Sequence, residues 1–405
     1  MWYDQAKPIA IHEEDDSVTA ADQTLPVYLD YNATTPIAPS VRAGMLPFIE
    51  QYFGNPSSDH RYGHEAARAV NRAREQVAAL LNCSADEIVF TSGGSESDNW
   101  ALLGRIWAAG VARPHVITTE IEHPAILNTC RFLECQGVDV TYLPVDGTGR
   151  VDPSAVRDAL RPDTVVISIM HANNEVGTIQ PLSEIAAICR EAEIPFHSDA
   201  AQSVGKIRTD VEELGVDLLT LAGHKLYAPK GIGALYIRRG TPIEPLIHGA
   251  GHEAGRRAGT ENVASIVGLG AAAELASRTL EDEGLRQSRL RDRLFELLAG
   301  QVAGTTLNGH PIERLPNTLN IRFTDLDGNA LLTATPAVAA ATGSACHAGH
   351  SEPSAVLLAM GIPAGEATGS VRLTLGRPTT GAEIEIAAAA LAASALQLRE
   401  GRLDR

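Results

Sequence analysis

The residues best suited to chemistry are His224 and Lys225, which directly follow a short apolar run. Residues 218–221 are typical of a buried strand, and Gly223 ends that strand. A lysine at the end of a buried strand is unusual, because loss of solvent disfavours its charged form and lowers its pKa. Such a lysine can form a Schiff base with a carbonyl group. This stretch alone is equally compatible with a surface lysine on a loop.

Other polar residues follow further apolar runs that predict strands. His123 follows residues 115–119, Asn174 follows residues 165–170, and Asp199 and Gln202 follow residues 195–197. Because ligands bind at the carboxyl ends of parallel strands, we expect these side chains to lie together with Lys225.

A glycine turn with an adjoining helix predicts an anion site. Residues 92–95 read Ser-Gly-Gly-Ser after the strand ending at Phe90, and Gly94 and Ser95 stand before a predicted helix, residues 96–109. Ser95 and Asp98 also predict a capping box there. Free N–H groups and the helix dipole favour an anion. No Gly-Lys-Ser/Thr follows, so a single phosphate is expected rather than a P-loop.

An acid, an amide, a histidine and a lysine beside a phosphate site match what pyridoxal 5'-phosphate requires. The lysine would form the Schiff base, and Asp199 would keep the pyridine nitrogen protonated. Each residue alone is more often a structural turn residue. Their combination predicts a pyridoxal phosphate site.

The chain resembles the cysteine desulfurases of the class V aminotransferase superfamily, in collinear order from about residue 27 to 398. The matching segments are residues 28–36, 53–58, 90–97, 170–175, 199–202, 223–225, 257–262 and 343–346. The resemblance implies a pyridoxal phosphate-dependent homodimer of fold type I, with a large and a small domain.

The resemblance also implies roles for individual residues. Catalysis would use Lys225, Cys346 and His123, with His123 stacked on the ring. The cofactor would be held by Gly94, Ser95, Asn174, Asp199, Gln202, His224 and Lys225, and by Thr260 reaching over from the partner subunit. The substrate would be held by Arg372, Asn174 and Asn32. Many family members have serine where this chain has Ala222, which removes one phosphate hydrogen bond.

Cys346 determines which reaction is expected. It lies in a segment of small residues bounded by glycine, and His347 and His350 nearby would lower its pKa if either is protonated. Together with the resemblance, this predicts conversion of L-cysteine to L-alanine, with the sulfur left on Cys346 as a persulfide. Cys83, Cys130, Cys135 and Cys189 are expected to be packing residues. No cysteine has zinc-ligand spacing, and no metal site is predicted.

The elements that position these residues alternate between strands and helices, which predicts a mostly parallel sheet covered on both faces. A long helical run, residues 271–298, then precedes strands 318–323 and 371–375 and a final helix, residues 383–399. We expect a mobile acidic extension at residues 1–25 and a large cofactor-binding domain at residues 36–280. A small α/β domain would comprise residues 26–35 and 281–405 and carry the Cys346 loop.

The net charge and the number of cysteines limit which binding partners and which cellular compartment are expected. The 405 residues carry a formal charge of −17, which disfavours direct binding of nucleic acid. No membrane segment or signal peptide is evident, and five cysteines indicate a reducing, cytoplasmic compartment. The sulfur acceptor stays open between an iron–sulfur scaffold, a sulfur carrier and the machinery of DNA phosphorothioation.

Alternative functions also stay open. A selenocysteine lyase is one alternative, because three features resemble that branch of the family. They are the Ala-Cys-His pattern at Cys346, a residue other than serine (Ala222) before Gly-His-Lys, and the Asp-Ala-Ala-Gln sequence that ends at Gln202. An ordinary aminotransferase would not need Cys346. A scaffold without activity would not need Lys225 or Asp199.

Overall fold

The computed structural model describes residues 25–343 and 353–403. The acidic extension, except for residue 25, and the stretch that contains Cys346, His347 and His350 lie outside the described residues. The structure therefore does not test the predictions made for these residues.

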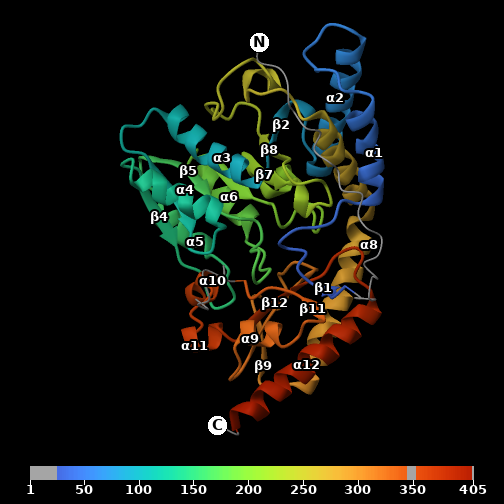
Figure 1. Ribbon diagram of the computed structural model, residues 1–405. Coiled ribbons are helices and arrows are strands. Elements are labelled where there is room, and N and C mark those ends of the chain that lie inside the picture. The colour runs from blue at the N-terminus through green and yellow to red at the C-terminus, as the bar shows by residue number, and fades with distance from the viewer. Residues whose placement is uncertain (1–24, 344–352, 404–405) are drawn as a thin grey trace, which may run out of the picture.

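A seven-stranded sheet forms the centre of the upper part of the molecule (Figure 1). Its order is β2 (Ile88–Thr91), β8 (Gly233–Ile237), β7 (Leu218–Ala222), β6 (Phe196–Asp199), β5 (Thr164–Ser168), β3 (His115–Thr119) and β4 (Asp139–Leu143). Strand β8 is antiparallel to both of its neighbours, and the remaining neighbouring pairs are parallel. The expected α/β fold with a mostly parallel central sheet is confirmed.

Helices cover the large sheet because its strands are apolar on both faces. They are α3 (Gly94–Ala109), α4 (Pro124–Glu134), α5 (Pro153–Ala159), α6 (Leu182–Glu191) and α7 (Val211–Leu214). A further group comprises α1 (Pro39–Glu50), α2 (Arg61–Leu81) and the first part of α8 (Val263–Gln301), which run side by side in Figure 1. Val41, Val77 and Leu269 join these three helices to the main core.

A smaller antiparallel sheet lies below the large one, with the order β12 (Ser370–Thr374), β10 (Thr318–Phe323) and β9 (Thr305–Asn308). The short strands β1 (Val27–Tyr28) and β11 (Val338–Ala339) pair beside it. The neighbouring helices are α9 (Gly328–Thr333), α10 (Ala355–Ala359), α11 (Ala364–Ala367) and α12 (Gly381–Leu403). The small unit is thus α/β in composition.

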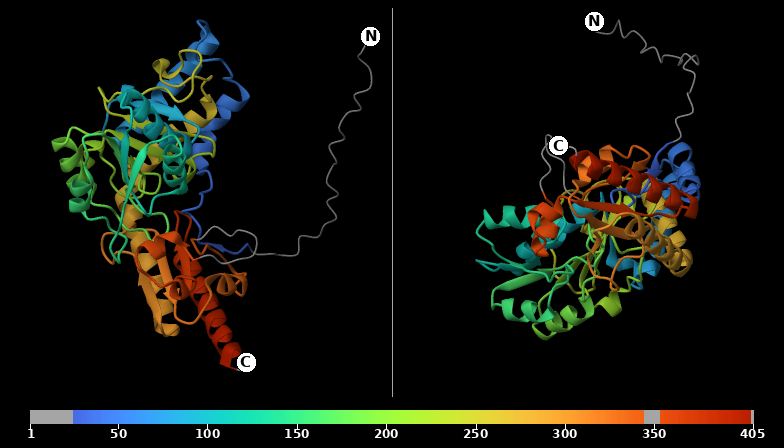
Figure 2. Two further views of the ribbon diagram at one scale, coloured as in Figure 1. Left: turned by 90° about the vertical axis from the view of Figure 1, so that its left-hand side faces the viewer. Right: turned by 90° about the horizontal axis from the view of Figure 1, so that it is seen from below.

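Helix α8 belongs to both parts of the molecule. Leu269 packs in the core of the large sheet, and Leu294 packs with Ile384 and Leu391 of α12 in the core of the small sheet. Figure 2 shows α8 and α12 extending together along the small unit. A boundary near residue 280 therefore falls inside a continuous helix.

By length and composition, α8 and α12 are the two described helices that could span a membrane. Several of their apolar side chains, such as Leu294, Leu298 and Leu391, are completely buried in the protein core. Packing against protein thus accounts for part of the apolar composition of both helices.

Candidate active site

Lys225 stands at the carboxyl edge of the large sheet. Strand β7 ends at Ala222, and the single turn η2 (Gly223–Lys225) follows at once. A Cβ atom on Gly223 would lie 2.8 Å from the backbone oxygen of Ile232, so only glycine fits this close turn. The backbone N–H of Gly223 donates to that same oxygen at 3.0 Å. This geometry fixes the position from which the lysine side chain starts.

One cavity of about 260 Å³ gathers most of the predicted site residues. Its lining includes Asn32, Gly94, Ser95, His123, Asn174, Asp199, His224, Lys225 and Arg372. These residues come from strand ends and loops that are far apart in the sequence, as the sheet topology predicts. Sequence reasoning did not single out Ala33 or Ala201 of the same lining or assign Asp98 to it.

The start of α3 presents backbone N–H groups to this cavity. The capping residue Gly93 has no side chain, and no side-chain hydrogen bond caps the helix. The predicted capping box between Ser95 and Asp98 is wrong, because the helix begins at Gly94 and Asp98 is buried at the cavity. An uncapped helix start with glycines on both sides is a suitable site for a phosphate group.

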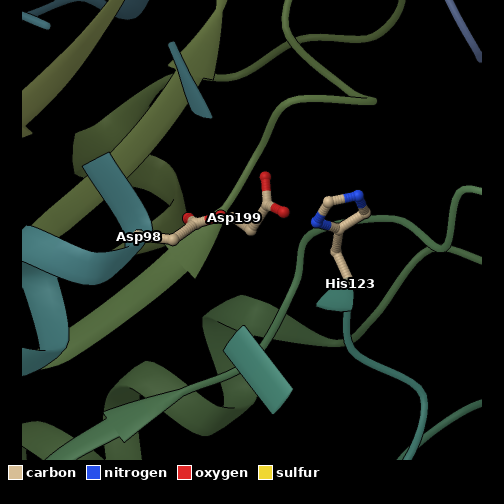
Figure 3. A group of neighbouring side chains, drawn as sticks. All are labelled: Asp98, His123 and Asp199. Atoms are coloured by element: carbon tan, nitrogen blue, oxygen red, sulfur yellow. The ribbon is translucent and has the colours of Figure 1, made fainter. Parts of the chain in front are cut away.

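Asp98, His123 and Asp199 form a tight group in the cavity (Figure 3). One ligand atom from each of the three side chains lies within 4.8 Å of the others, so the group could also hold a metal ion. Lys225 and Arg372 line the same cavity and would repel a cation. The donor set therefore fits a protonated ring nitrogen beside Asp199 better than it fits a metal. No metal site was expected from the sequence, and this group could be recognised only in three dimensions.

Burial controls the protonation of the groups in this cavity. Loss of solvent raises the pKa of the Asp98 carboxyl well above its usual value, and the nearby Asp199 raises it further. The same loss of solvent lowers the pKa of His123, and it lowers that of His224 to about 4. Both imidazoles are therefore favoured in the neutral form at pH 7, which suits His123 to accept or donate a proton.

Lys225 meets the physical requirement for a nucleophilic amine. Loss of solvent lowers the pKa of Lys225, the Asp199 carboxylate opposes this shift, and Arg372 adds to it. The uncharged amine is thus more accessible at neutral pH than in an exposed lysine. No described residue hydrogen-bonds to Nζ of Lys225, which leaves the amine available for a ligand.

Asn32 and Gln202 belong to a buried hydrogen-bond network behind the cavity. Nζ of Lys206 donates to Asn32 Oδ1 at 2.9 Å and to Gln202 Oε1 at 2.8 Å. Gln202 Nε2 donates to the backbone oxygen of Asn32 at 3.0 Å, and Asn32 Nδ2 donates to that of Asn174 at 3.1 Å. Both Nδ2 hydrogens of Asn32 are in use, since Nδ2 also donates to Thr318 Oγ1 at 2.9 Å, so a donor contact from Asn32 to a ligand would need one of these bonds to change. Lys206 was not singled out from the sequence, since only the fold brings it to the amides.

Arg372 reaches the cavity from strand β12 of the small sheet. Its Nη2 donates to Asp30 Oδ1 at 2.9 Å, and its Nη1 donates to the backbone oxygen of Asn174 at 3.2 Å. Its buried Nε has no hydrogen-bond partner among the described residues. The guanidinium is thus oriented by two of its five N–H groups, and the remaining N–H groups have no hydrogen-bond partner among the described residues.

Thr260 does not join the other residues of the predicted site. It lines a separate cavity of about 190 Å³ together with Ser92, Arg257 and Gly259. A larger cavity, about 640 Å³, opens at the opposite edge of the large sheet and contains Arg190, Asp217 and Arg238. It holds none of the predicted residues, so we assign the chemistry to the smaller cavity around Lys225.

Comparison with known proteins identifies the family of the chain. The family model described as aminotransferase class-V matches residues 27–386. A protein named cysteine desulfurase IscS from Methanosarcina thermophila is 48% identical over 380 residues, which is 93% of each chain. Another of that name from Dictyoglomus turgidum is 49% identical over 356 residues, 87% of this chain and 90% of its own.

Solved structures give the same assignment. A NifS-like protein superposes with a TM-score of 0.85 at 37% identity, covering 91% of this chain and 98% of its own. A structure described as SspA in complex with cysteine gives a TM-score of 0.78 at 39% identity, covering 86% of this chain and 98% of its own.

The chain belongs to the class-V aminotransferase family, whose model matches most of its length. Within that family it is a member of the cysteine desulfurases. The resemblance seen in the sequence motifs is thereby confirmed.

Proposed function

We propose that the protein is a pyridoxal 5'-phosphate-dependent cysteine desulfurase that converts L-cysteine to L-alanine and takes up the sulfur on Cys346 as a persulfide. The observation that carries this proposal is the cavity in which Lys225, with a lowered pKa, shares its walls with Asp199, His123 and the start of α3. Relatives named cysteine desulfurase support the substrate.

The cavity residues suit pyridoxal phosphate group by group. The start of α3 at Gly94 and Ser95, with His224, would hold the phosphate, and Asp199 would pair with the ring nitrogen. His123 would stack on the ring, and Thr260 would contact the phosphate from the partner subunit. Joined to the amine of an amino acid substrate in place of Lys225, the cofactor would withdraw electrons from the substrate Cα atom.

The chain's own residues supply binding and proton transfer. Arg372 binds the substrate carboxylate, because its orientation is already fixed by Asp30 and Asn174. The amine of Lys225 takes the proton from Cα, and the neutral imidazole of His123 assists that transfer. Loss of solvent in the cavity lowers the pKa of both bases and so favours their uncharged forms.

Sulfur transfer then depends on Cys346. Its thiolate forms a bond to the substrate sulfur, and the bond between that sulfur and the substrate Cβ breaks. The electron pair of the broken bond stays with Cβ, which is protonated to become the methyl group of alanine. The transferred sulfur remains on Cys346 as a persulfide, ready for a thiol of an acceptor protein. The acceptor would be an iron–sulfur scaffold, a sulfur carrier or the DNA-phosphorothioation machinery.

A homodimer in the cytoplasm is part of the same proposal. Large apolar side chains are exposed around α1 and the start of α2, including Ile49, Phe53 and Tyr62. Thr260 lies away from the Lys225 cavity of its own chain, which supports a role in the partner's site. The described cysteines form no disulfide, as is usual in a reducing compartment.

A selenocysteine lyase is the second candidate, because Ala222, where many desulfurases have serine, lines the cavity. The experiment that separates the candidates incubates the purified, cofactor-loaded protein with L-cysteine or L-selenocysteine, in the presence and absence of a 2-oxo acid. We expect one alanine per persulfide on Cys346 in the first turnover, without need of the 2-oxo acid. Alanine formed only from selenocysteine would establish the lyase, and dependence on the 2-oxo acid would establish an aminotransferase.

A further inference from the structure

Glu175 lies between the cavity wall and the small sheet, and the proposed mechanism assigns it no role. It directly follows Asn174 of the cavity wall. Its backbone N–H donates to Asn173 Oδ1 at 2.8 Å, and its backbone oxygen accepts from Asn320 Nδ2 of β10 at 3.1 Å. The backbone of Glu175 is therefore held both by its own loop and by the small sheet, which fixes the direction in which the side chain leaves.

The Glu175 carboxylate meets both described ends of the stretch that contains Cys346. On one end, Ser354 Oγ donates to Glu175 Oε2 at 2.5 Å. On the other end, a Cβ atom added to Gly343 would lie 2.7 Å from the same oxygen. Gly343 also has a φ of +86°, a backbone conformation that favours glycine. One carboxylate thus contacts residues eleven positions apart, 343 and 354.

The two ends are anchored to different parts of the molecule. Before the stretch, Ala341 pairs with Arg372 of the small sheet, and the Arg372 N–H donates to the Ala341 oxygen at 2.6 Å. After it, Ser354 caps α10, whose Val356 and Leu357 pack against Met170 and Val176 of the large unit. Glu175 lies between these anchors and brings them together at the cavity.

We propose that Glu175 is a positioning residue that holds the base of the Cys346-bearing stretch against the substrate cavity. The inference rests on the proposed function. In that function the Cys346 thiol must reach the sulfur of a bound substrate, so the base of its stretch has to be fixed. The carboxylate is suited to this task. Its Oε2 atom accepts a hydrogen bond from Ser354, and Gly343, which has no side chain, lies close to the same atom.

The charge state of Glu175 adds a second consequence. Loss of solvent raises its pKa to about 7, while the Ser354 hydrogen bond and the charge of Arg372 oppose that rise. These are the polar and charged groups of the described residues that act on the carboxylate, one from the start of α10 and one from β12. The strong charge-assisted bond from Ser354 is therefore lost as the pH falls below 7.

The test uses the cofactor-loaded full chain and separates substrate binding from sulfur transfer. Glu175→Ala removes the contact, Glu175→Gln keeps the shape without the charge, and Glu296→Ala removes an exposed carboxylate on α8 as a control. Substrate binding is read from the change in the cofactor's visible spectrum on addition of L-cysteine. Sulfur transfer is read as the single-turnover rate of persulfide formation on Cys346, by alkylation and mass spectrometry.

We expect Glu175→Ala to slow persulfide formation about tenfold or more, because the thiol is no longer positioned. The affinity for L-cysteine, read from the change in the visible spectrum, should stay within about twofold of the parent's. Glu175→Gln should be intermediate in rate, and its rate should fall less than the parent's as the pH falls from 8 to 6. An unchanged rate in Glu175→Ala would overturn the proposal, as would loss of cofactor and cysteine binding together with the rate. If the parent protein forms no persulfide, the proposed function fails instead.

Gly343 provides a second variant pair. Gly343→Ala places a methyl group against Glu175, and it should slow persulfide formation in the parent more than in the Glu175→Ala background, where the clash is removed. Equal slowing in both backgrounds would contradict a functional contact between the two residues.

Discussion

The guanidinium of Arg372 and the carboxylate of Asp30 form an ion pair, with 2.9 Å between Nη2 and Oδ1. Arg372 belongs to β12, whereas Asp30 follows β1 at the start of the described chain. The pair therefore joins two ends of the sequence at the cavity. It leaves Nε of Arg372 without a partner among the described residues.

This relationship predicts that lysine cannot replace Arg372. Lysine presents one ammonium group and cannot bond Asp30, Asn174 and a substrate carboxylate in the same planar arrangement. We expect Arg372→Lys to raise KM for cysteine about tenfold or more, the range expected for a lost charge-assisted bond. Arg322→Lys on the neighbouring strand β10 is the matched control and should leave KM unchanged. A KM in Arg372→Lys equal to that of the parent would show that the substrate carboxylate binds elsewhere.

Lys225→Ala tests the cofactor attachment. Without the amine, the cofactor has no residue in the cavity with which to form the Schiff base, and the proton acceptor for Cα is lost. We expect loss of the visible absorbance of the lysine-bound cofactor and a fall in alanine formation of about a thousandfold or more. Lys230→Ala, which changes an exposed lysine five residues further on, should retain both signals. Retention of the absorbance in Lys225→Ala would assign the Schiff base to another lysine.

Ala222→Ser tests how firmly the phosphate is held. Ala222 lines the cavity and lies beside Gly94 at the start of α3, where a Cβ atom would be 3.4 Å from the Ala222 methyl group. A serine hydroxyl there would add one hydrogen bond to the phosphate, worth about 1 kcal/mol, so cofactor release should slow about fivefold. Ala222→Gly adds no donor and should not slow release. If serine and glycine gave equal release rates, the position would not contact the phosphate.

His171 predicts a pH dependence of stability. It is 3% exposed, and loss of solvent lowers its pKa to about 4. The unfolded chain therefore binds a proton more readily, so stability is present above the unfolded pKa of about 6.5 and is lost as the pH falls toward 4. Between pH 7 and 5 this residue should reduce the free energy of unfolding by about 2 kcal/mol.

Urea denaturation at several pH values checks this expectation. His171→Gln should make the decrease between pH 7 and 5 smaller by about 2 kcal/mol, with the share of other buried histidines such as His224 remaining, whereas His64→Gln, which changes an exposed histidine on α2, should retain the full decrease. An identical slope in His171→Gln and the parent would mean that His171 is already charged in the folded state.

Much of the site could be predicted from sequence because the sheet edge imposes it. Apolar runs followed by polar residues place Lys225, Asp199 and His123 at strand ends, and the parallel topology brings those ends together. The motifs of the family supplied residues that periodicity does not reveal, such as Arg372 on the small sheet.

The remaining contacts depend on tertiary packing. Asp98 looked like a capping residue because local spacing fits a capping box, yet the fold turns its side chain toward the cavity. Lys206 and Glu175 gain their roles from residues more than a hundred positions away, Asn32 and Ser354. Helix α8 likewise continues through the expected domain boundary, because both of its halves find apolar cores.

The most direct test of the account is the single-turnover reaction of the Cys346→Ser variant with L-cysteine. The variant should bind the cofactor and cysteine as the parent does, because the described cavity is built without this residue. It should form no protein persulfide, and alanine formation should fall to background. Alanine formed at the parent's rate in Cys346→Ser would contradict the account, because the sulfur would then leave cysteine without passing through Cys346.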